Sequence, residues 1–309
     1  MRLRISDTKQ LIGGEDHSHG VEYWQVPKVI LGGGSPGPRI YFANRLAGQS
    51  HIFSIDLDVD LTPLWTTLTR RLAPADTPGT FDDEGVMPAD VVSTANGNKM
   101  LYSGWNSRNT VPYHNATGIA DISADGDLKR TGSGPVMERN WHFPYLSVTP
   151  TVWGAGPFHC VYVNGDGWFY DADRCEPLYS LKYARSNNLL EWRRDTTTLV
   201  DWNEHRPCHS NPCHFVIDGR NIILYCDRAA VDYRANGANG YDIAGLIFDI
   251  TPVSASKLEI EWEEPRLFGI NDHMRAYPEV FEWDNELFLL TNGNGFGRTG
   301  ILMSRIEVI

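Results

Sequence analysis

The sequence has no apolar run of about 18 residues, the length that a membrane-spanning helix requires. Its N-terminus, Met1 to Ser6, also lacks the apolar segment of a secretory signal. Cysteine is scarce: there are five residues, and this odd number fits reduced thiols better than a disulfide framework. From these absences we expect a chain that, if complete, stays in the cytoplasm and enters no membrane.

Positive charge is also in short supply, with 27 lysines and arginines against 39 aspartates and glutamates. The resulting formal charge of −12 repels a phosphate backbone, so nucleic acid is not an expected partner. Long amphipathic helical patterns are missing, whereas 29 glycines and 18 prolines indicate many turns. A hydrophobic content of 41% supplies a large core and excludes a disordered, collagen-like or coiled-coil protein.

The sequence does contain a repeated pattern, in which a proline is followed after one or two residues by an apolar or β-branched pair. The five prolines are 61, 62, 62 and 66 residues apart, so five copies fill the 309 residues. Scattered prolines would rarely keep such even steps together with the same downstream residues. The copies begin near Pro27, Pro88, Pro150, Pro212 and Pro278.

Each copy continues with the same succession of turns and β-rich runs. A turn with Gly, Asn or Asp is followed by an apolar run such as Ile40–Phe42 or Ile223–Tyr225. A third run, as in His51–Asp56, and a fourth, as in Leu190–Arg193 or Leu258–Trp262, complete most copies. Short runs with a turn signal about every ten residues are typical of antiparallel β-structure.

Four antiparallel strands in each of five copies predict an all-β protein, a single-domain five-bladed β-propeller over residues 1–309. Repetition around a ring also removes most exposed sheet edges. The chain ends just after the third strand of the fifth copy, so the fourth strand must come from elsewhere. Arg2–Ile5 is the expected donor, because this segment is apolar and alternating, and it would close the ring.

The direction of the strands indicates where a functional site would lie. If the first strand of each blade runs down a central channel, the segments before the prolines and the loops between second and third strands meet on one face. Carboxylates, arginines, asparagines and aromatics on these segments suit a carbohydrate or an activated sugar as the partner. The predicted substrate-binding residues are Trp24, Arg45, Asp82, Trp105, Asn106, His209, Asp227, Arg228, Arg234, Arg275, Tyr277, Asn292 and Asn294.

The five-copy pattern resembles the five-bladed propellers of the glycoside hydrolase 43/32/130-like superfamily. The likeness is sharpest in Phe81–Pro88 together with Leu101–Trp105. The stretches Tyr233–Gly245 and Asn292–Gly300 look like a glycosidase-like branch that is common in bacterial polysaccharide gene clusters. The resemblance implies hydrolysis or phosphorolysis of glycosidic bonds by carboxylates in the central funnel.

Such chemistry uses a protonated acid at the leaving oxygen and an ionised carboxylate, roughly 6.5–9.5 Å apart in an inverting enzyme. Asp83 is the candidate base, Glu204 beside Arg206 is the candidate general acid, and Asp272 is a third carboxylate that orients substrate or tunes its neighbours. The segment Tyr145–Thr149 carries no acid, which departs from the superfamily pattern. Glycosyl transfer, a lyase-like activity and sugar binding without hydrolysis, including nucleotide-sugar processing in polysaccharide biosynthesis, therefore stay open.

Several of these residues could also have purely structural roles. Asp83 could cap a turn, and Glu204 could form an ion pair at the rim of the funnel. A zinc site is the main alternative to a carbohydrate site, because the segment His205–His214 contains three histidines and two cysteines. Cys213 and His214 would point to opposite faces of a strand, however, so no metal is expected. No other cofactor is expected, and a propeller that only scaffolds protein partners is the rival class.

Overall fold

The computed structural model describes residues 1–13, 20–32, 34–171, 174–234, 236–263 and 274–309. Strands dominate these residues, which confirms the predicted all-β class, and none of their helices is long and apolar enough to cross a membrane. In chain order, the elements are β1 (Arg2–Ile12), β2 (Gln25–Ile30), β3 (Arg39–Leu46), β4 (Gln49–Leu57), β5 (Pro63–Leu72), β6 (Gly85–Thr94), β7 (Gly97–Ser107), β8 (Tyr113–Ile122), β9 (Leu128–Arg130), β10 (Ser147–Trp153), β11 (Phe158–Asp171), β12 (Arg174–Ser186), β13 (Arg193–Thr198), β14 (Cys208–Ile217), β15 (Arg220–Arg228), β16 (Asp242–Phe248), η2 (Pro252–Ser254), β17 (Ser256–Trp262), β18 (Ala276–Trp283), β19 (Glu286–Asn292), α1 (Asn294–Gly297) and β20 (Ile301–Val308).

The strands pair antiparallel in successive groups along the chain. The groups β2–β5, β6–β9, β10–β13 and β14–β17 each contain four strands. The last group consists of β18, β19 and β20, and β1 joins it antiparallel to β20, with Leu3 opposite Val308 and Ile5 opposite Ile306. The N-terminal strand also pairs parallel with β17, so it joins the fourth group to the last.

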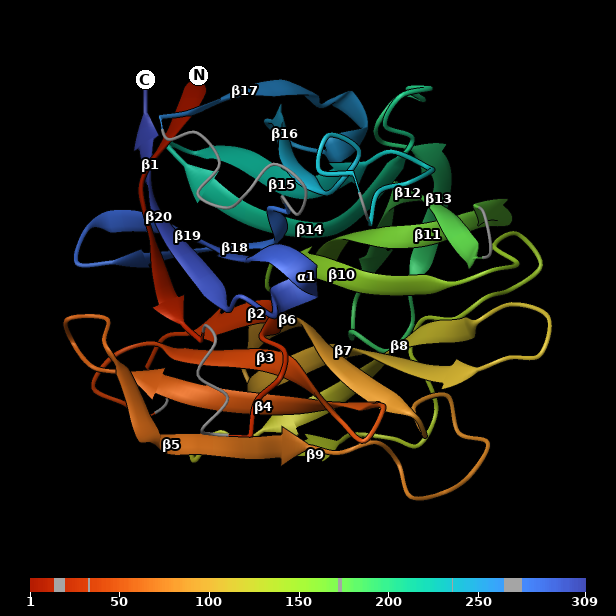
Figure 1. Ribbon diagram of the computed structural model, residues 1–309, viewed down its shortest axis with the longest axis horizontal. Coiled ribbons are helices and arrows are strands. Elements are labelled where there is room, and N and C mark those ends of the chain that lie inside the picture. The colour runs from red at the N-terminus through yellow and green to blue at the C-terminus, as the bar shows by residue number, and fades with distance from the viewer. Residues whose placement is uncertain (14–19, 33, 172–173, 235, 264–273) are drawn as a thin grey trace.

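The first strand of each group lies at the centre of the molecule. Strand β2 lies beside β6, β6 beside β10, β10 beside β14, β14 beside β18, and β18 beside β2. These inner strands therefore form a closed ring, while β5, β9 and β17 lie at the periphery (Figure 1). Loops at one end of the inner strands consequently converge on a common axis.

The repeated prolines mark an irregularity in every inner strand. A register shift interrupts the pairing at each proline, as between Gln25 and Lys28 or between Pro88 and Asp90. Proline has no N–H to donate to the neighbouring strand, and its ring crowds the residue before it. In four copies that preceding residue has a positive φ of 43° to 58°, which is unusual for side-chain-bearing residues: Val26, Thr149, Asn211 and Tyr277. Bulges of this kind re-aim side chains.

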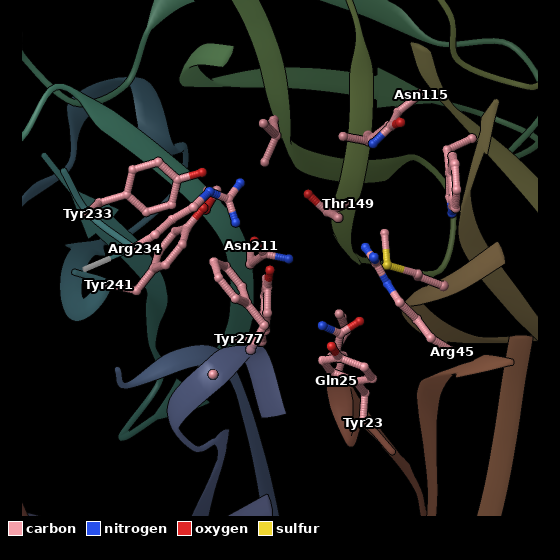
Figure 2. A pocket seen from close by; sticks show the side chains of 18 of the residues that line it. Tyr23, Gln25, Arg45, Asn115, Thr149, Asn211, Tyr233, Arg234, Tyr241 and Tyr277 are labelled. Carbon is pink, nitrogen blue, oxygen red and sulfur yellow. The ribbon is translucent and has the colours of Figure 1, made fainter. Parts of the chain in front are cut away.

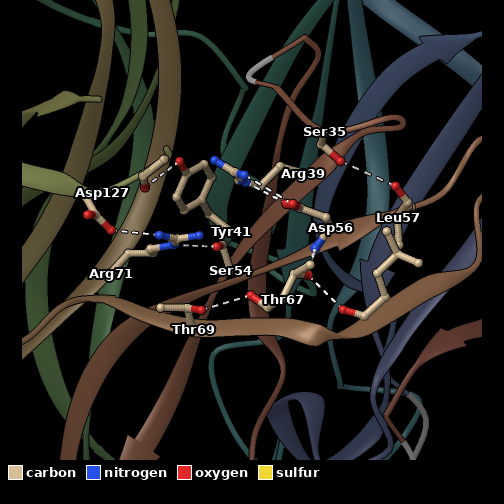
Figure 3. A network of polar contacts seen from close by, with 12 residues as sticks. Ser35, Arg39, Tyr41, Ser54, Asp56, Leu57, Thr67, Thr69, Arg71 and Asp127 are labelled. Atoms are coloured by element: carbon tan, nitrogen blue, oxygen red, sulfur yellow. Dashed lines mark hydrogen bonds and ion pairs between the residues drawn. The ribbon is translucent and has the colours of Figure 1, made fainter. Parts of the chain in front are cut away.

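A network of polar contacts joins the first group to the second (Figure 3). The Nε and Nη2 atoms of Arg39 donate to the carboxylate of Asp56 at 2.6 and 3.1 Å. The hydroxyl of Tyr41 donates to the carbonyl oxygen of Gly126 at 2.9 Å, and Arg71 pairs with Asp127 at 2.7 Å. Side chains of β3 and β5 thereby fix the turn between β8 and β9 in the next group.

The predicted fourth strand of the third copy begins later than expected. Leu190 and Glu191 form a turn, and their backbone N–H groups donate to Asn188 Oδ1 at 3.0 and 2.9 Å. The indole N–H of Trp192 donates to the carbonyl oxygen of Leu189 at 3.0 Å. These local bonds compete with strand pairing, so β13 begins at Arg193.

Candidate functional site

A cavity of about 590 Å³ opens where the inner strands converge. Every inner strand contributes the residue that precedes its proline to the lining: Val26, Met87, Thr149, Asn211 and Tyr277. The bulges described above therefore aim one side chain from each strand group at the same space. Figure 2 shows Gln25, Thr149, Asn211 and Tyr277 around this space.

One wall of the cavity is built from tyrosines. The ring of Tyr241 lies 5.7 Å from that of Tyr233 and 6.2 Å from that of Tyr277, and its hydroxyl is 3.2 Å from the hydroxyl of Tyr179. Figure 2 shows Tyr233, Tyr241 and Tyr277 together on one side. The wall offers flat apolar faces edged with hydroxyl groups.

A buried arginine supports this tyrosine wall from behind. Arg228 is 0% exposed, and its Nη1 and Nη2 atoms donate to the carbonyl oxygens of Ala229 and Pro177, both at 2.8 Å. Its guanidinium carbon lies 3.9 Å from the ring centre of Tyr233, a close cation–π contact. Its Nε donates to the hydroxyl of Tyr241 at 3.2 Å. The predicted binding residue Arg228 thus holds the wall in place and lies outside the cavity lining.

The carboxylate of Glu176 fixes two further groups of the same wall. The hydroxyl of Tyr233 donates to Glu176 Oε2 at 2.6 Å, and Arg234 donates from Nε and Nη2 at 2.7 and 3.1 Å. Burial alone would raise the pKa of Glu176, but the hydrogen bonds from Arg234 and Tyr233 outweigh it and lower that pKa. Glu176 is 4% exposed and does not belong to the lining.

Trp105, Arg45, Tyr23 and Arg298 also line the cavity. The indole N–H of Trp105 donates to Ser50 Oγ at 2.8 Å. Its ring passes so close to Gly85 that a Cβ atom there would lie 1.9 Å from Nε1. Arg298 donates from Nε and Nη2 to the hydroxyl of Tyr23 at 3.0 and 2.7 Å, and Arg45 lies 5.9 Å from the Tyr23 ring.

Several lining residues carry a buried side-chain oxygen without a hydrogen-bond partner within the described part of the chain. Buried polar atoms of folded proteins are normally paired with protein or water. A cluster of unpaired oxygens around one cavity is therefore suited to hydroxyl groups of a ligand or to the water that precedes it. These atoms belong to Asn115, Thr149, Ser210 and Thr299.

No protein-family model matches the chain. Two uncharacterized proteins of Mycobacterium tuberculosis are 28% and 27% identical to it, each over 87% of this chain and 88% of their own length. Among solved structures, a thermostable family-43 glycoside hydrolase has a TM-score of 0.64 at 14% identity and covers 96% of this chain and 91% of its own.

An α-L-arabinofuranosidase from Lactobacillus brevis has a TM-score of 0.65 at 10% identity and covers 93% of this chain and 91% of its own. A sucrose-6-phosphate hydrolase from Lactobacillus gasseri has a TM-score of 0.64 at 11% identity and covers 94% of this chain and 61% of its own. The chain therefore shares its fold with these glycoside hydrolase structures. At these identities the likeness concerns the fold, and the reaction has to be argued from the residues of the site.

Against this glycosidase fold, the predicted substrate-binding residues fall into two sets. The first set lines the cavity: Arg45, Trp105, Arg234, Tyr277 and Asn294. They come from strands or loops of four strand groups and from α1. Tyr277 precedes a proline, and the others lie at or after the end of a second strand.

The second set lies outside the lining and makes structural contacts. Trp24 is 2% exposed, and its ring lies 4.6 Å from that of Phe42. Asp82 is 1% exposed and accepts hydrogen bonds from Tyr102 and Arg130 at 3.0 and 2.7 Å. Backbone, ion-pair or ring contacts also occupy Asn106, His209, Asp227, Arg228, Arg275 and Asn292.

The two described carboxylates with predicted catalytic roles have separate surroundings, and neither lines the cavity. Asp83 Oδ2 accepts the backbone N–H of Gly79 at 2.6 Å. Glu204 is not held by Arg206, which pairs with Asp227 at 2.7 Å instead, and the Glu204 side chain is 81% exposed. Glu204 therefore faces solvent and not the enclosed cavity. Asp272 lies outside the described residues.

The histidines and cysteines of 205–214 are also dispersed. Cys213 Sγ lies 3.6 Å from Glu279 Oε2, whereas His214 Nε2 lies 2.9 Å from Asn221 Oδ1. Within the described ranges, no three His, Cys, Asp or Glu side chains form a group that could hold a metal ion.

Sequence reasoning missed the lining residues that stand at the start of a third strand. Tyr113 begins β8, Arg174 begins β12, Tyr241 precedes β16 and Thr299 lies just before β20. The position of these residues could have identified them, because the loop between second and third strands lies at the same face as the prolines. The residues stand at the C-terminal end of this loop, where the third strand begins.

Two or three residues beyond the lining, the inner strands carry buried charges. Lys28 Nζ donates to Glu279 Oε2 at 2.8 Å, and both side chains are at most 10% exposed. Asp90 accepts the backbone N–H of Val152 at 2.6 Å and that of Val91 at 2.9 Å. Burial, together with the charge of Glu279, raises the pKa of Asp90 to about 7, although the nearby Lys28 ammonium acts in the opposite direction.

The raised pKa of Asp90 predicts a pH-dependent stability. A protonated Asp90 favours the folded state, so its contribution is complete below the unfolded pKa of about 3.9 and is lost as the pH rises through about 7. We expect Asp90→Asn, which stays neutral, to gain stability relative to the unaltered protein between pH 5 and pH 8. Urea unfolding at four pH values in this range measures the difference, and a constant difference would show that Asp90 is already ionised when folded.

Proposed function

We propose that the protein is a carbohydrate-active, five-bladed β-propeller that binds a saccharide in the cavity at the centre of its ring. The five strand groups would be the blades, with β1 as the fourth strand of the last blade. The proposal rests on the composition of the cavity. Each strand group contributes the side chain before its proline, and tyrosines, a tryptophan and unpaired side-chain oxygens complete the lining. The fold around this cavity is shared with glycosidases.

The chemistry of the lining suits a sugar ring. Its C–H faces can stack on Trp105 and on the tyrosine wall, and its hydroxyls can bond to amide and hydroxyl groups such as those of Asn115 and Ser210. A volume of about 590 Å³ lies within the usual range of ligand pockets and has room for a short oligosaccharide.

Glycosidic hydrolysis is the second candidate, and the fold of the neighbouring structures favours it. The reaction normally requires two carboxyl groups on opposite sides of the scissile bond. The described residues of the lining include no aspartate or glutamate. Catalysis by Asp83, Glu204 and Asp272 therefore stays a prediction. Our first proposal is sugar binding, or glycosyl processing that does not use a pair of carboxyl groups.

A glycan array followed by titration calorimetry tests the proposal. We expect saturable binding of at least one saccharide and about tenfold weaker binding by Trp105→Ala, because the stacking face is lost. Trp202→Ala is the matched control, since Trp202 is 72% exposed and outside the lining. Any bound oligosaccharide is then incubated with protein, and release of reducing ends, reduced in Asp83→Asn and Glu204→Gln, would favour hydrolysis.

Two outcomes would contradict the proposal. If no saccharide on the array binds saturably, the rival of a propeller that scaffolds protein partners gains support. Equal effects of Trp105→Ala and Trp202→Ala on a bound sugar would place its site elsewhere on the molecule.

A further inference from the structure

The cavity has a charge opposite to that of the whole chain. Acidic residues outnumber basic ones by 39 to 27 in the sequence, yet the described lining contains four arginines and no aspartate or glutamate. The four are Arg45, Arg174, Arg234 and Arg298. A neutral sugar would not require this reversal of charge.

The arginines enter from different parts of the ring. Arg45 lies at the end of β3, Arg174 at the start of β12, and Arg234 between β15 and β16. Figure 2 shows Arg45 and Arg234 on opposite sides of the cavity, with Asn211 and Tyr277 between them. Guanidinium groups from opposite walls can therefore act on one ligand.

Two of these arginines keep their charge available to a ligand. Within the described residues, no carboxylate lies within 4.0 Å of the guanidinium nitrogens of Arg45 or Arg174, although ion pairs occupy many other arginines of the chain. Arg234 is already held by Glu176 through Nε and Nη2. Arg234 is thus part of the fixed wall, whereas Arg45 and Arg174 have no carboxylate partner among the described residues.

The charges of two of these arginines also act on a tyrosine of the wall. Burial raises the pKa of Tyr277, while the charges of Arg234 and Arg45 act in the opposite direction. Both guanidinium groups thus influence the same phenol at the bottom of the cavity. Planar guanidinium groups recognise carboxylates and phosphates through paired hydrogen bonds, which a hydroxyl group cannot match.

We propose that the ligand of this cavity is an acidic saccharide, whose carboxylate or phosphate group is bound by Arg45 and Arg174. This inference rests on the proposed saccharide site and specifies its substrate class. The aromatic walls would take the sugar ring, and the arginines would select for the anion.

Matched ligand pairs test the inference by titration calorimetry. Trigalacturonic acid is compared with its methyl ester, which removes the charge at almost the same size, and glucose 1-phosphate is compared with glucose. We expect the acidic member of at least one pair to bind at least about tenfold more tightly than its neutral partner. The pair that responds identifies the anion as carboxylate or phosphate, and the preference should shrink as salt is raised.

Arginine variants locate the effect. We expect Arg45→Gln and Arg174→Gln each to weaken binding of the acidic ligand at least about tenfold and to weaken binding of its neutral partner much less, so that the preference for the acidic ligand falls. Arg70→Gln is the control, because Arg70 is exposed on β5 outside the lining. Neutral ligands that bind as tightly as acidic ones would overturn the charge inference and leave the saccharide site standing. Absence of binding by every saccharide, acidic or neutral, would overturn both.

Discussion

Replacing Lys28 by methionine should lower the free energy of unfolding by about 3–5 kcal/mol, the usual cost of leaving a buried partner charge uncompensated. Lys28 on β2 donates to Glu279 on β18 at 2.8 Å, and its charge also acts on Asp90 of β6. Burial alone would lower the pKa of Lys28, but Glu279, Cys213 and Asp90 act together to raise that pKa. Methionine keeps the length of the side chain and removes the charge, so the inner strands would hold two acids without a cation.

Two further variants make this prediction specific. Lys182 is 7% exposed but donates to Thr196 and Thr198 rather than to a carboxylate, so Lys182→Met should cost only about 1–2 kcal/mol. In Lys28→Met combined with Glu279→Gln only Asp90 is left without a cation, so part of the loss should be recovered. Denaturant unfolding at pH 7 measures all three. Equal losses in Lys28→Met and Lys182→Met would mean that the ion pair adds nothing specific.

The fold was predictable because its signals are local and repeated. Each copy carries a proline, a turn and alternating apolar runs within about sixty residues, and the alternating apolar pattern of Arg2–Ile5 predicts the strand that pairs with β20. The same locality explains the error at Leu190–Trp192, where apolar residues suggest a strand. The side chain of Asn188 bonds to the backbone there and makes a turn instead.

The site was less predictable because its groups are set by partners far apart in the sequence. Nothing near Glu176 indicates that it will bind Arg234, 58 residues away, and nothing near Arg206 indicates that it will choose Asp227 over the adjacent Glu204. An inventory of polar residues on the correct face therefore mixed cavity residues with wall supports such as Arg228. The resemblance to glycoside hydrolases also implied carboxylates in the funnel, whereas the described lining contains four arginines and no aspartate or glutamate.

Removing residues 1–8 should have the largest effect on stability, because these residues provide most of β1. Strand β1 pairs with β20 on one side and β17 on the other, so its loss would expose two strand edges at once. Leu3 and Ile5, which are 0% and 1% exposed, would leave a gap in the core beside Leu258 and Ile306. We expect the truncated protein to aggregate or to melt at a much lower temperature, and an unchanged melting temperature would contradict the closing role of β1.

Point variants of the same strand separate edge pairing from general disruption. Leu3→Ala and Ile5→Ala should each cost about 2–5 kcal/mol, as buried aliphatic side chains do, whereas Lys9→Ala on the exposed side of β1 should change stability by less than about 0.5 kcal/mol. A synthetic peptide of residues 1–12 should also raise the melting temperature of the truncated protein, because an added strand can pair with both free edges. A peptide carrying Asp at positions 3 and 5 cannot bury these side chains and should have no effect. If both peptides rescue equally, charge or crowding would explain the gain, and strand insertion would not.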